Sequence, residues 1–132
     1  MSYCSFDLQK EEARLLLQTA LVATGKNFFK SAAGILAALE AFRPDEVSVA
    51  VAKAILMISV QDFDLALSFL DREALVKWPD SAMLKAFRGM ALIRAGRKDD
   101  AVGCLTEAVQ SNDKAAANLA SGLLSDIGGN VK

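Results

Sequence analysis

The sequence predicts an all-α protein made of repeated pairs of helices, and three observations support this prediction. Apolar residues recur at positions i, i+3, i+4 and i+7, and no stretch keeps the alternating pattern of a strand. Residues that favour helices, chiefly alanine and leucine, dominate these stretches, whereas the two prolines and several glycines fall between them. Small residues also recur about every 34 residues along the chain.

Seven helices are expected, each bounded by glycine, proline or polar residues. Their predicted ranges are 7–24, 28–42, 44–59, 63–75, 79–95, 98–110 and 113–127. Pro44 and Pro79 suit the first turn of a helix, where the N–H group that proline lacks would have no intrahelical partner. Gly96 is expected to end its helix in the left-handed conformation, which glycine adopts without strain.

The internal repeat is seen in four sets of three positions, in which successive members are 34 and 35 residues apart. The sets are Ala20, Ala54 and Gly89; Ala23, Met57 and Leu92; Ala32, Ala66 and Ala101; and Leu36, Leu70 and Leu105. A period of 34 residues, with small residues where two helices cross, is typical of the tetratricopeptide repeat. The second step is one residue longer, and we place the extra residue near Trp78 and Pro79.

The repeats predict the architecture of the whole chain. We expect a right-handed superhelical array of about three tetratricopeptide-like helical hairpins in a single domain, residues 1–132. The hairpins are expected at about 13–46, 47–81 and 82–113. A C-terminal capping helix at about 113–127 would then cover the open end of the array.

Composition and charge exclude several classes of function. The chain of 132 residues has 15 lysines and arginines against 16 aspartates and glutamates, and a net charge of -1 gives nucleic acid no electrostatic attraction. Histidine is absent, which removes the commonest general base and metal ligand. Cys4 and Cys104 form no zinc or redox motif. We therefore expect no enzymatic activity, no metal, no cofactor and two free thiols.

The sequence shows no targeting or membrane-spanning segment. Its first residues contain no basic stretch followed by a long apolar one, as a signal peptide would. The apolar stretch 47–60 is interrupted by Ser48, Lys53 and Ser59 and is too short to span a bilayer. We expect a cytoplasmic protein without a membrane span.

The repeats also predict a partner-binding groove on the inner face of the array. If they start near Ala13, Val47 and Ala82, nine apolar residues in the first helix of each repeat face the concave side. These residues are Leu17, Leu21, Val51, Ile55, Ile58, Met83, Phe87, Met90 and Ile93. Such a groove suits the apolar face of an amphipathic helix, and its methionines adapt to the shape of a partner. The same residues would also suit a core between repeats, and both interpretations stay open.

Two other features are weaker candidates for a site. Lys53, Lys85, Arg88 and Arg94 are of the type found in the basic groove with which tetratricopeptide clamps bind acidic chain ends, but they are poorly placed for such a clamp. Trp78 would either anchor a partner or cover the core between two repeats.

Four short stretches carry a family resemblance. The stretch 20–26, Ala-Leu-Val-Ala-Thr-Gly-Lys, ends the first predicted helix. It is followed by Asp-Phe-Asp-Leu-Ala-Leu at 62–67, Trp-Pro-Asp at 78–80 and Ser-Asn-Asp at 111–113. In residue type and order, over residues 13–127, they resemble the small tetratricopeptide-like needle-subunit chaperones of bacterial type III secretion, the YscG-type family.

The resemblance implies a non-enzymatic bacterial chaperone in the cytoplasm that holds the needle-forming subunit and prevents its premature polymerisation. It also implies that an amphipathic helix of the client lies against the nine apolar residues, and that a second small helical co-chaperone takes part. Without a client, an exposed apolar groove would favour self-association into a homo-oligomer. A chaperone of type III translocator proteins and a general tetratricopeptide adaptor remain alternatives.

Overall fold

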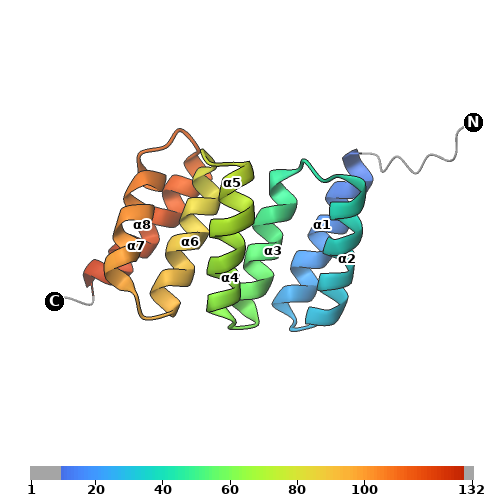
Figure 1. The fold of residues 1–132 in the computed structure, drawn as a ribbon, viewed down its shortest axis with the longest axis horizontal. Coiled ribbons are helices and arrows are strands. Elements are labelled where there is room, and N and C mark those ends of the chain that lie inside the picture. The colour runs from blue at the N-terminus through green and yellow to red at the C-terminus, as the bar shows by residue number, and fades with distance from the viewer. Residues whose placement is uncertain (1–9, 130–132) are drawn as a thin grey trace, which may run out of the picture. The chain divides into compact units, whose positions relative to one another are not determined.

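The computed structural model describes residues 10–129, and all secondary structure in this range is helical (Figure 1). A turn of π-helix, η1, joins α4 and α5 into one continuous helix. The elements are α1 (Lys10–Gly25), α2 (Phe29–Phe42), α3 (Val47–Ser59), α4 (Phe63–Phe69), η1 (Leu70–Ala74), α5 (Leu75–Lys77), α6 (Ala82–Arg94), α7 (Lys98–Val109) and α8 (Lys114–Gly129). The predicted all-α class is confirmed for the described residues.

The backbone contacts divide the chain into two compact units, residues 1–61 and 62–132. The first unit contains α1 to α3, and the second contains α4 to α8. The boundary falls inside the segment predicted as the second repeat, 47–81. Each unit has its own packing, and the single superhelical domain remains a prediction.

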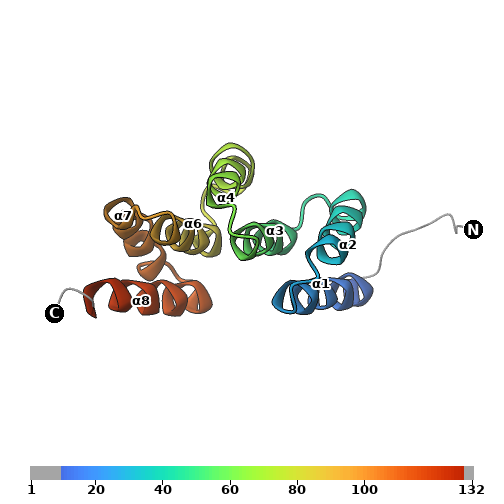
Figure 2. The same ribbon diagram turned by 90° about the horizontal axis from the view of Figure 1, so that it is seen from below.

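In the first unit, α1 and α2 form a hairpin and α3 packs against both helices (Figure 2). The buried residues at the centre of this unit are Ala13, Ala20, Leu36, Leu39, Val49 and Ala52. Half of them are alanines, so the helices approach one another closely. Larger residues at the edges, among them Leu17 and Leu21, pack over this cluster and keep part of their surface exposed.

In the second unit, α6 is the helix on which the others pack. It contacts α4, η1, α7 and α8, and α7 also contacts α8. Leu84 and Leu92 of α6 are fully buried, as are Leu70 of η1 and Leu105 of α7. Helix α8 lies against the α6–α7 hairpin, in the place expected for a helix that caps this pair (Figure 2).

Three turns contain a residue with positive φ, and these residues recur with the same steps as the small residues. They are Asn27 (φ 68°), Gln61 (φ 71°) and Gly96 (φ 84°), which are 34 and 35 residues apart. Each follows the first helix of a predicted repeat. After Gly96, the N–H of Arg97 donates to the C=O of Leu92 at 2.8 Å and closes the turn. The left-handed helix end predicted at Gly96 is confirmed.

The two prolines lie in loops and not in a first helical turn, contrary to the prediction. Pro44 precedes a helix that begins at Val47, and Pro79 precedes a helix that begins directly after Ser81. The hydroxyl Oγ of Ser81 accepts a hydrogen bond from the N–H of Leu84 at 3.2 Å. This capping bond satisfies a helix-end donor and sets the start of α6 three residues beyond the proline.

The π-turn accounts for the one-residue difference between the two repeat steps. The continuous helix 63–77 is one residue longer than α2, whereas the loops that follow these helices, 43–46 and 78–81, have equal lengths. A π-turn accommodates one extra residue inside an α-helix. The extra residue therefore lies in η1, and its predicted place near Trp78 and Pro79 is wrong.

In two of the recurring sets every member is a small residue, and all of these residues are buried. Ala32, Ala66 and Ala101 have no exposed surface, and neither do Ala20 and Ala54. In the recurring leucine set, no member is more than 2% exposed. Equivalent positions thus have equivalent burial in three of the four sets, whereas in the fourth Leu92 is buried and Ala23 and Met57 are partly exposed. The three matching sets support the interpretation of these segments as repeats.

Gly89 lies at a helix crossing that has no room for a Cβ atom. A Cβ atom placed on Gly89 would lie 2.5 Å from Cδ2 of Leu105 and 2.6 Å from its Cγ. We predict that Gly89→Ala lowers the free energy of unfolding by about 1–3 kcal/mol, because Leu105 has to shift within a packed core. Urea unfolding measures this difference.

Gly103→Ala on α7 is the matched control for this substitution. Nothing lies within 4 Å of a Cβ atom placed there. Alanine should therefore raise the free energy of unfolding by about 0.5–1 kcal/mol, because it restricts the unfolded chain. Equal effects of the two substitutions would contradict a close crossing at Gly89.

Candidate partner-binding surface

In the first unit, four of the predicted groove residues lie on two helices that pack against each other. Leu17 and Leu21 are one turn apart on α1, and Val51 and Ile55 are one turn apart on α3. All four are partly exposed. Because Leu17 and Leu21 also pack against the buried cluster, their positions are set by the core while an apolar edge faces solvent. We call these four residues the first apolar surface.

Ile58 does not share this exposure. Only 4% of its surface is exposed, and it continues a buried row on α3 formed by Ala50 and Ala54, which are 5% and 0% exposed. Val51 and Ile55 belong to the neighbouring row, one residue further along the chain. Since so little of its surface is open to a partner, we assign Ile58 to the core and not to a groove.

In the second unit, the remaining four predicted groove residues all lie on α6. Met83, Phe87 and Met90 are spaced i, i+4 and i+7 and share one face, and Ile93 borders this face near the end of the helix. All four are partly exposed, whereas the positions between them include fully buried residues. The helix thus has a buried side and a partly open apolar face. We call these four residues the second apolar surface.

Helix α8 adds apolar residues beside the second apolar surface, although the sequence predicted it only as a cap. Leu123 and Ile127 are one turn apart and lie across a cavity of about 220 Å³ from Met90 and Ile93. Among the described residues, the lining is Met90, Ile93, Arg94, Lys98, Leu123, Asp126 and Ile127. The spacing of Leu123 and Ile127 is a visible helical signal, but the repeat pattern places no groove position on this helix.

A cavity of about 570 Å³ lies in the first unit, beside the N-terminal ends of α1 and α3. Leu17 belongs both to its lining and to the first apolar surface. The lining residues are Lys10, Glu11, Ala13, Arg14, Leu17, Leu39, Arg43, Glu46, Ser48 and Val49. No sequence motif indicated this cavity, because its lining comes from three helices and the loop between α2 and α3.

Three of the four cations considered for a basic groove are paired with carboxylates in the structure. The nitrogen–oxygen distances are 3.1 Å for Lys53–Glu40, 3.1 Å for Lys85–Glu107 and 2.6 Å for Arg88–Asp71. These pairs compete with an acidic partner for the same cations, and the basic groove is therefore disfavoured. The fourth cation, Arg94, lines the cavity between α6 and α8.

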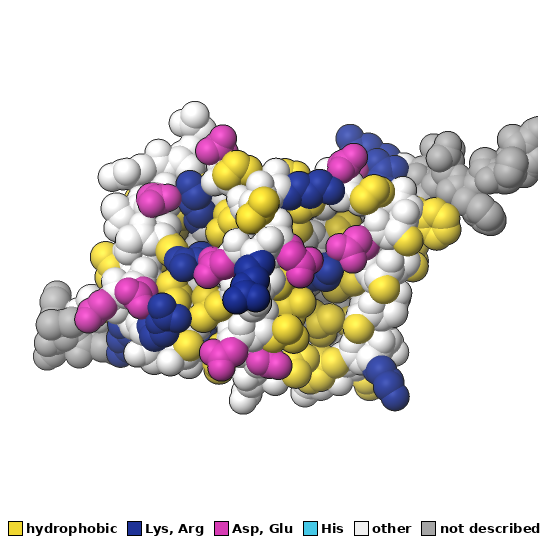
Figure 3. All heavy atoms as spheres, in the orientation of Figure 1, with side chains coloured by type: hydrophobic (Ala, Val, Ile, Leu, Met, Phe, Trp, Pro, Cys, Tyr) yellow, Lys and Arg dark blue, Asp and Glu magenta, His cyan; other side chains and the backbone are white. Residues whose placement is uncertain are grey.

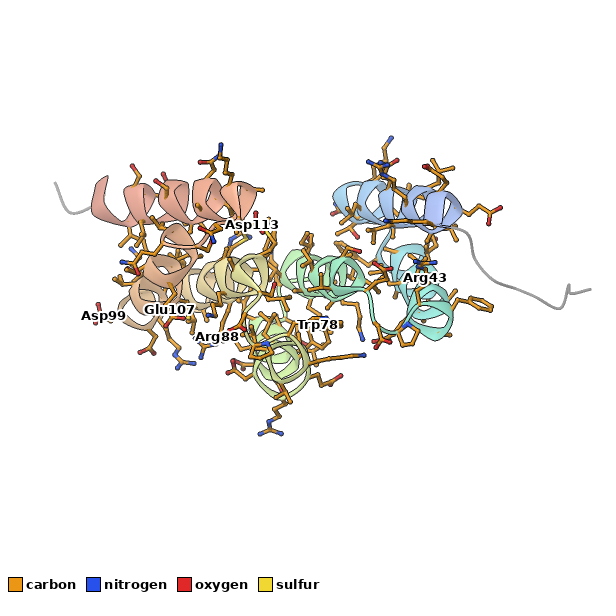
Figure 4. The ribbon with its side chains drawn as sticks, turned by 90° about the horizontal axis from the view of Figure 1, so that it is seen from above. Arg43, Trp78, Arg88, Asp99, Glu107 and Asp113 are labelled. Carbon is orange, nitrogen blue, oxygen red and sulfur yellow. The ribbon has the colours of Figure 1, made fainter. Side chains whose placement is uncertain are left out.

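Arg88 connects three segments of the second unit (Figure 4). Its Nε and Nη2 atoms donate to the carboxylate of Asp71 in η1 at 2.6 and 3.5 Å, and its Nη1 atom donates to Sγ of Cys104 on α7. The hydrogen bond to Asp71 raises the pKa of Arg88 above its ordinary value, so the arginine keeps its charge. Cys104 is a free thiol, and Cys4 lies outside the described residues.

Trp78 is partly exposed at the end of α5 (Figure 4). Nζ of Lys77 lies 5.0 Å from the centroid of its ring, within the range of a cation–π interaction. This contact is compatible with both roles considered for Trp78, a partner anchor and a cover for the core.

Large apolar residues are also exposed outside the two apolar surfaces. Leu15 and Val22 on α1 are 62% and 57% exposed, Val76 on α5 is 68% exposed and Val102 on α7 is 42% exposed. Over α4 and α7, Figure 3 shows hydrophobic side chains interspersed with charged ones of both signs. Single exposed apolar residues are common on protein surfaces and indicate no site by themselves.

Neither metal-binding clusters, membrane-spanning helices nor matches to known proteins indicate a function for the described residues. Within residues 10–129, no group of three or more cysteine, aspartate or glutamate side chains is arranged to hold a metal ion. No helix in the same part of the chain is long and apolar enough to cross a membrane. Comparisons with protein-family models, curated proteins and solved structures found no match.

The Arg88–Asp71 pair provides a test of the packing around η1. The two side chains are 26% and 46% exposed, so water screens the pair in part. We predict that Asp71→Asn lowers the free energy of unfolding by about 0.5–1 kcal/mol, and by less in 1 M salt. Urea unfolding at low and high salt measures both effects.

Asp100→Asn is the control for the Asp71 substitution. Asp100 pairs with Arg97, and their side chains are 58% and 56% exposed, so the loss should be smaller, roughly 0.3 kcal/mol. A greater loss for Asp100→Asn than for Asp71→Asn would contradict the connecting role of Arg88.

Proposed function

We propose that this protein is a bacterial type III secretion chaperone that binds the needle-forming subunit through its two apolar surfaces and prevents premature polymerisation. The observation that carries the proposal is the presence of partly exposed apolar residues in each unit, on α1 and α3 in the first and on α6 in the second. The resemblance of four sequence stretches to the YscG-type family supports the choice of client. A second small helical co-chaperone and a cytoplasmic location belong to the same proposal.

The chemistry of the two surfaces suits an amphipathic helix. Leucine, valine, isoleucine, methionine and phenylalanine supply apolar contact area, and helical spacing matches the i, i+3, i+4 and i+7 pattern of a partner helix. Methionine side chains adapt to irregular partner surfaces. Lys53 and Lys85, the nearby cations on α3 and α6, are already paired with carboxylates, so apolar contact would dominate binding.

Binding of this kind would control assembly by mass action. A needle subunit that polymerises through an apolar helix face cannot do so while that face is covered, and the free concentration of competent subunit falls accordingly. A general tetratricopeptide adaptor or a chaperone of translocator proteins would use the same surfaces for another client. Co-purification with the needle subunit and not with a translocator protein separates these alternatives.

Single charges placed in the two apolar surfaces test the proposal. Ile55→Glu and Met90→Glu should each weaken client binding by about 2 kcal/mol or more, roughly 30-fold, because a carboxylate would be desolvated against the apolar face of the client helix. Thermal melting should change little, since both side chains are partly exposed in the free protein. The measurements are a quantitative pull-down of the needle subunit and a melting curve for each variant.

Val22→Glu and Val102→Glu are matched controls in the first and second units. These valines are 57% and 42% exposed and lie outside the two apolar surfaces. Both variants should bind the client as the unmodified chain does. If Ile55→Glu and Met90→Glu melt and bind normally, the proposed surface is wrong; if they unfold, the residues belong to a core.

A further inference from the structure

The 570 Å³ cavity of the first unit combines an apolar floor with a polar rim. Ala13, Leu39 and Val49 are at most 9% exposed and form the floor together with the partly exposed Leu17. Charged side chains and the hydroxyl of Ser48 surround this floor. An occupant of the cavity therefore has to supply apolar side chains to the floor.

The described part of the chain begins at this cavity. Lys10, the first described residue, belongs to the lining, and residues 1–9 directly precede it in the sequence. These nine residues read Met-Ser-Tyr-Cys-Ser-Phe-Asp-Leu-Gln. Tyr3 and Phe6 offer large apolar surfaces, and Asp7 carries the only charged side chain. The segment thus has side chains that suit the floor, and little charge would be desolvated when it covers the floor.

The segment is long enough to reach the floor. On α1, Leu17 lies seven residues beyond Lys10, roughly 10 Å along the helix axis. Phe6 lies four residues before Lys10, and four residues of extended chain span up to about 13 Å. A reversal of the chain before Lys10 therefore brings Phe6 back over the floor, and Tyr3 reaches further still. Because the segment and the cavity belong to one chain, their effective concentration is high, on the order of millimolar.

We propose that residues 1–9 fold back over this cavity and that the rings of Tyr3 and Phe6 pack on its apolar floor. The occupant is thus a segment of the same chain. The segment covers the exposed side of Leu17, which also belongs to the first apolar surface, so a partner that uses Leu17 has to displace it. The inference rests on the cavity and on the sequence of the segment, and it does not depend on the proposed function.

NMR of the full chain tests this placement. The ring protons of Phe6 should show nuclear Overhauser effects to the methyl groups of Leu39 and Val49. Tyr3→Ser/Phe6→Ser should shift the signals of these methyl groups, because the ring currents of both aromatic side chains are lost. Phe28→Ser is the matched control. Phe28 is 60% exposed and lies beyond the C-terminal end of α1, outside the lining, so its loss should leave the same methyl signals unchanged.

A variant of the rim tests the same contact from the side of the cavity. Ser48 is an exposed residue of the lining, so the ring introduced by Ser48→Phe competes with the segment for the floor. The ring signals of Tyr3 and Phe6 should then move to the positions that they have in a free peptide of residues 1–9. Ser31→Phe adds the same ring at an exposed position of α2 outside the lining and should leave them unchanged. Melting curves verify that each variant is folded.

Several outcomes would overturn the inference. These are free-peptide signals of Tyr3 and Phe6 in the unmodified chain, or unchanged methyl signals of Leu39 and Val49 in the Tyr3→Ser/Phe6→Ser variant. Overhauser effects that arise only between differently labelled chains would make a second copy the occupant. Helical contacts through residues 6–10 without any contact to the floor would mean that the segment continues α1. None of these measurements uses the needle subunit, so the proposed function is tested separately.

Discussion

Close approach of helices at alanine and glycine is the constraint on which the rest of this structure depends. Ala20, Ala54, Ala66 and Ala101 have no exposed surface, and Gly89 has no room for a methyl group beside Leu105. Small residues at a crossing bring helix axes together, so that leucines on both sides interlock with few voids. A larger residue at any of these positions would force the helices apart and open the leucine layer.

The same constraint explains why apolar residues remain partly exposed. Because alanines occupy the helix crossings, the larger apolar side chains of α1, α3 and α6 lie beside these crossings. Neighbouring helices cover one side of each of them, and the other side is exposed to solvent. Leu17 and Leu21 show this most clearly, because they pack on the buried cluster and still face solvent. A single helix thus has both a buried stripe and a partly exposed apolar stripe, and a charge on the second need not disturb the first.

Local patterns predicted the all-α class and the approximate positions of the helices. The helical periodicity of apolar residues predicted the positions of the helices, and the 34-residue steps predicted most of the buried small residues. Both signals arise because a buried helix face needs apolar or small residues at regular intervals along the chain. The π-turn was missed, since an extra residue inside a helix has no distinctive composition. The left-handed turns at Asn27 and Gln61 were missed because neither residue is glycine, which is the usual residue at such a helix end.

The candidate site could be predicted only in part. Eight of the nine groove positions are partly exposed, but Ile58 falls in a buried row because a helix turns by 100° per residue and a one-step error changes the face. The contributions of Leu123 and Ile127, and the cavity beside Lys10 and Arg14, depend on which helices meet in space. Contacts between helices that are distant in the sequence produce no regular spacing of residues along the chain.

Methyl NMR of the protein with and without the needle subunit would test the central claim most directly. Labelled methyl groups of Leu17, Leu21, Val51, Ile55, Met83 and Met90 report on the two apolar surfaces, and those of Val22, Val76 and Val102 report on exposed positions outside them. Large shift changes are expected in the first set and none in the second. Changes confined to the second set, with the first unaffected, would contradict the central claim.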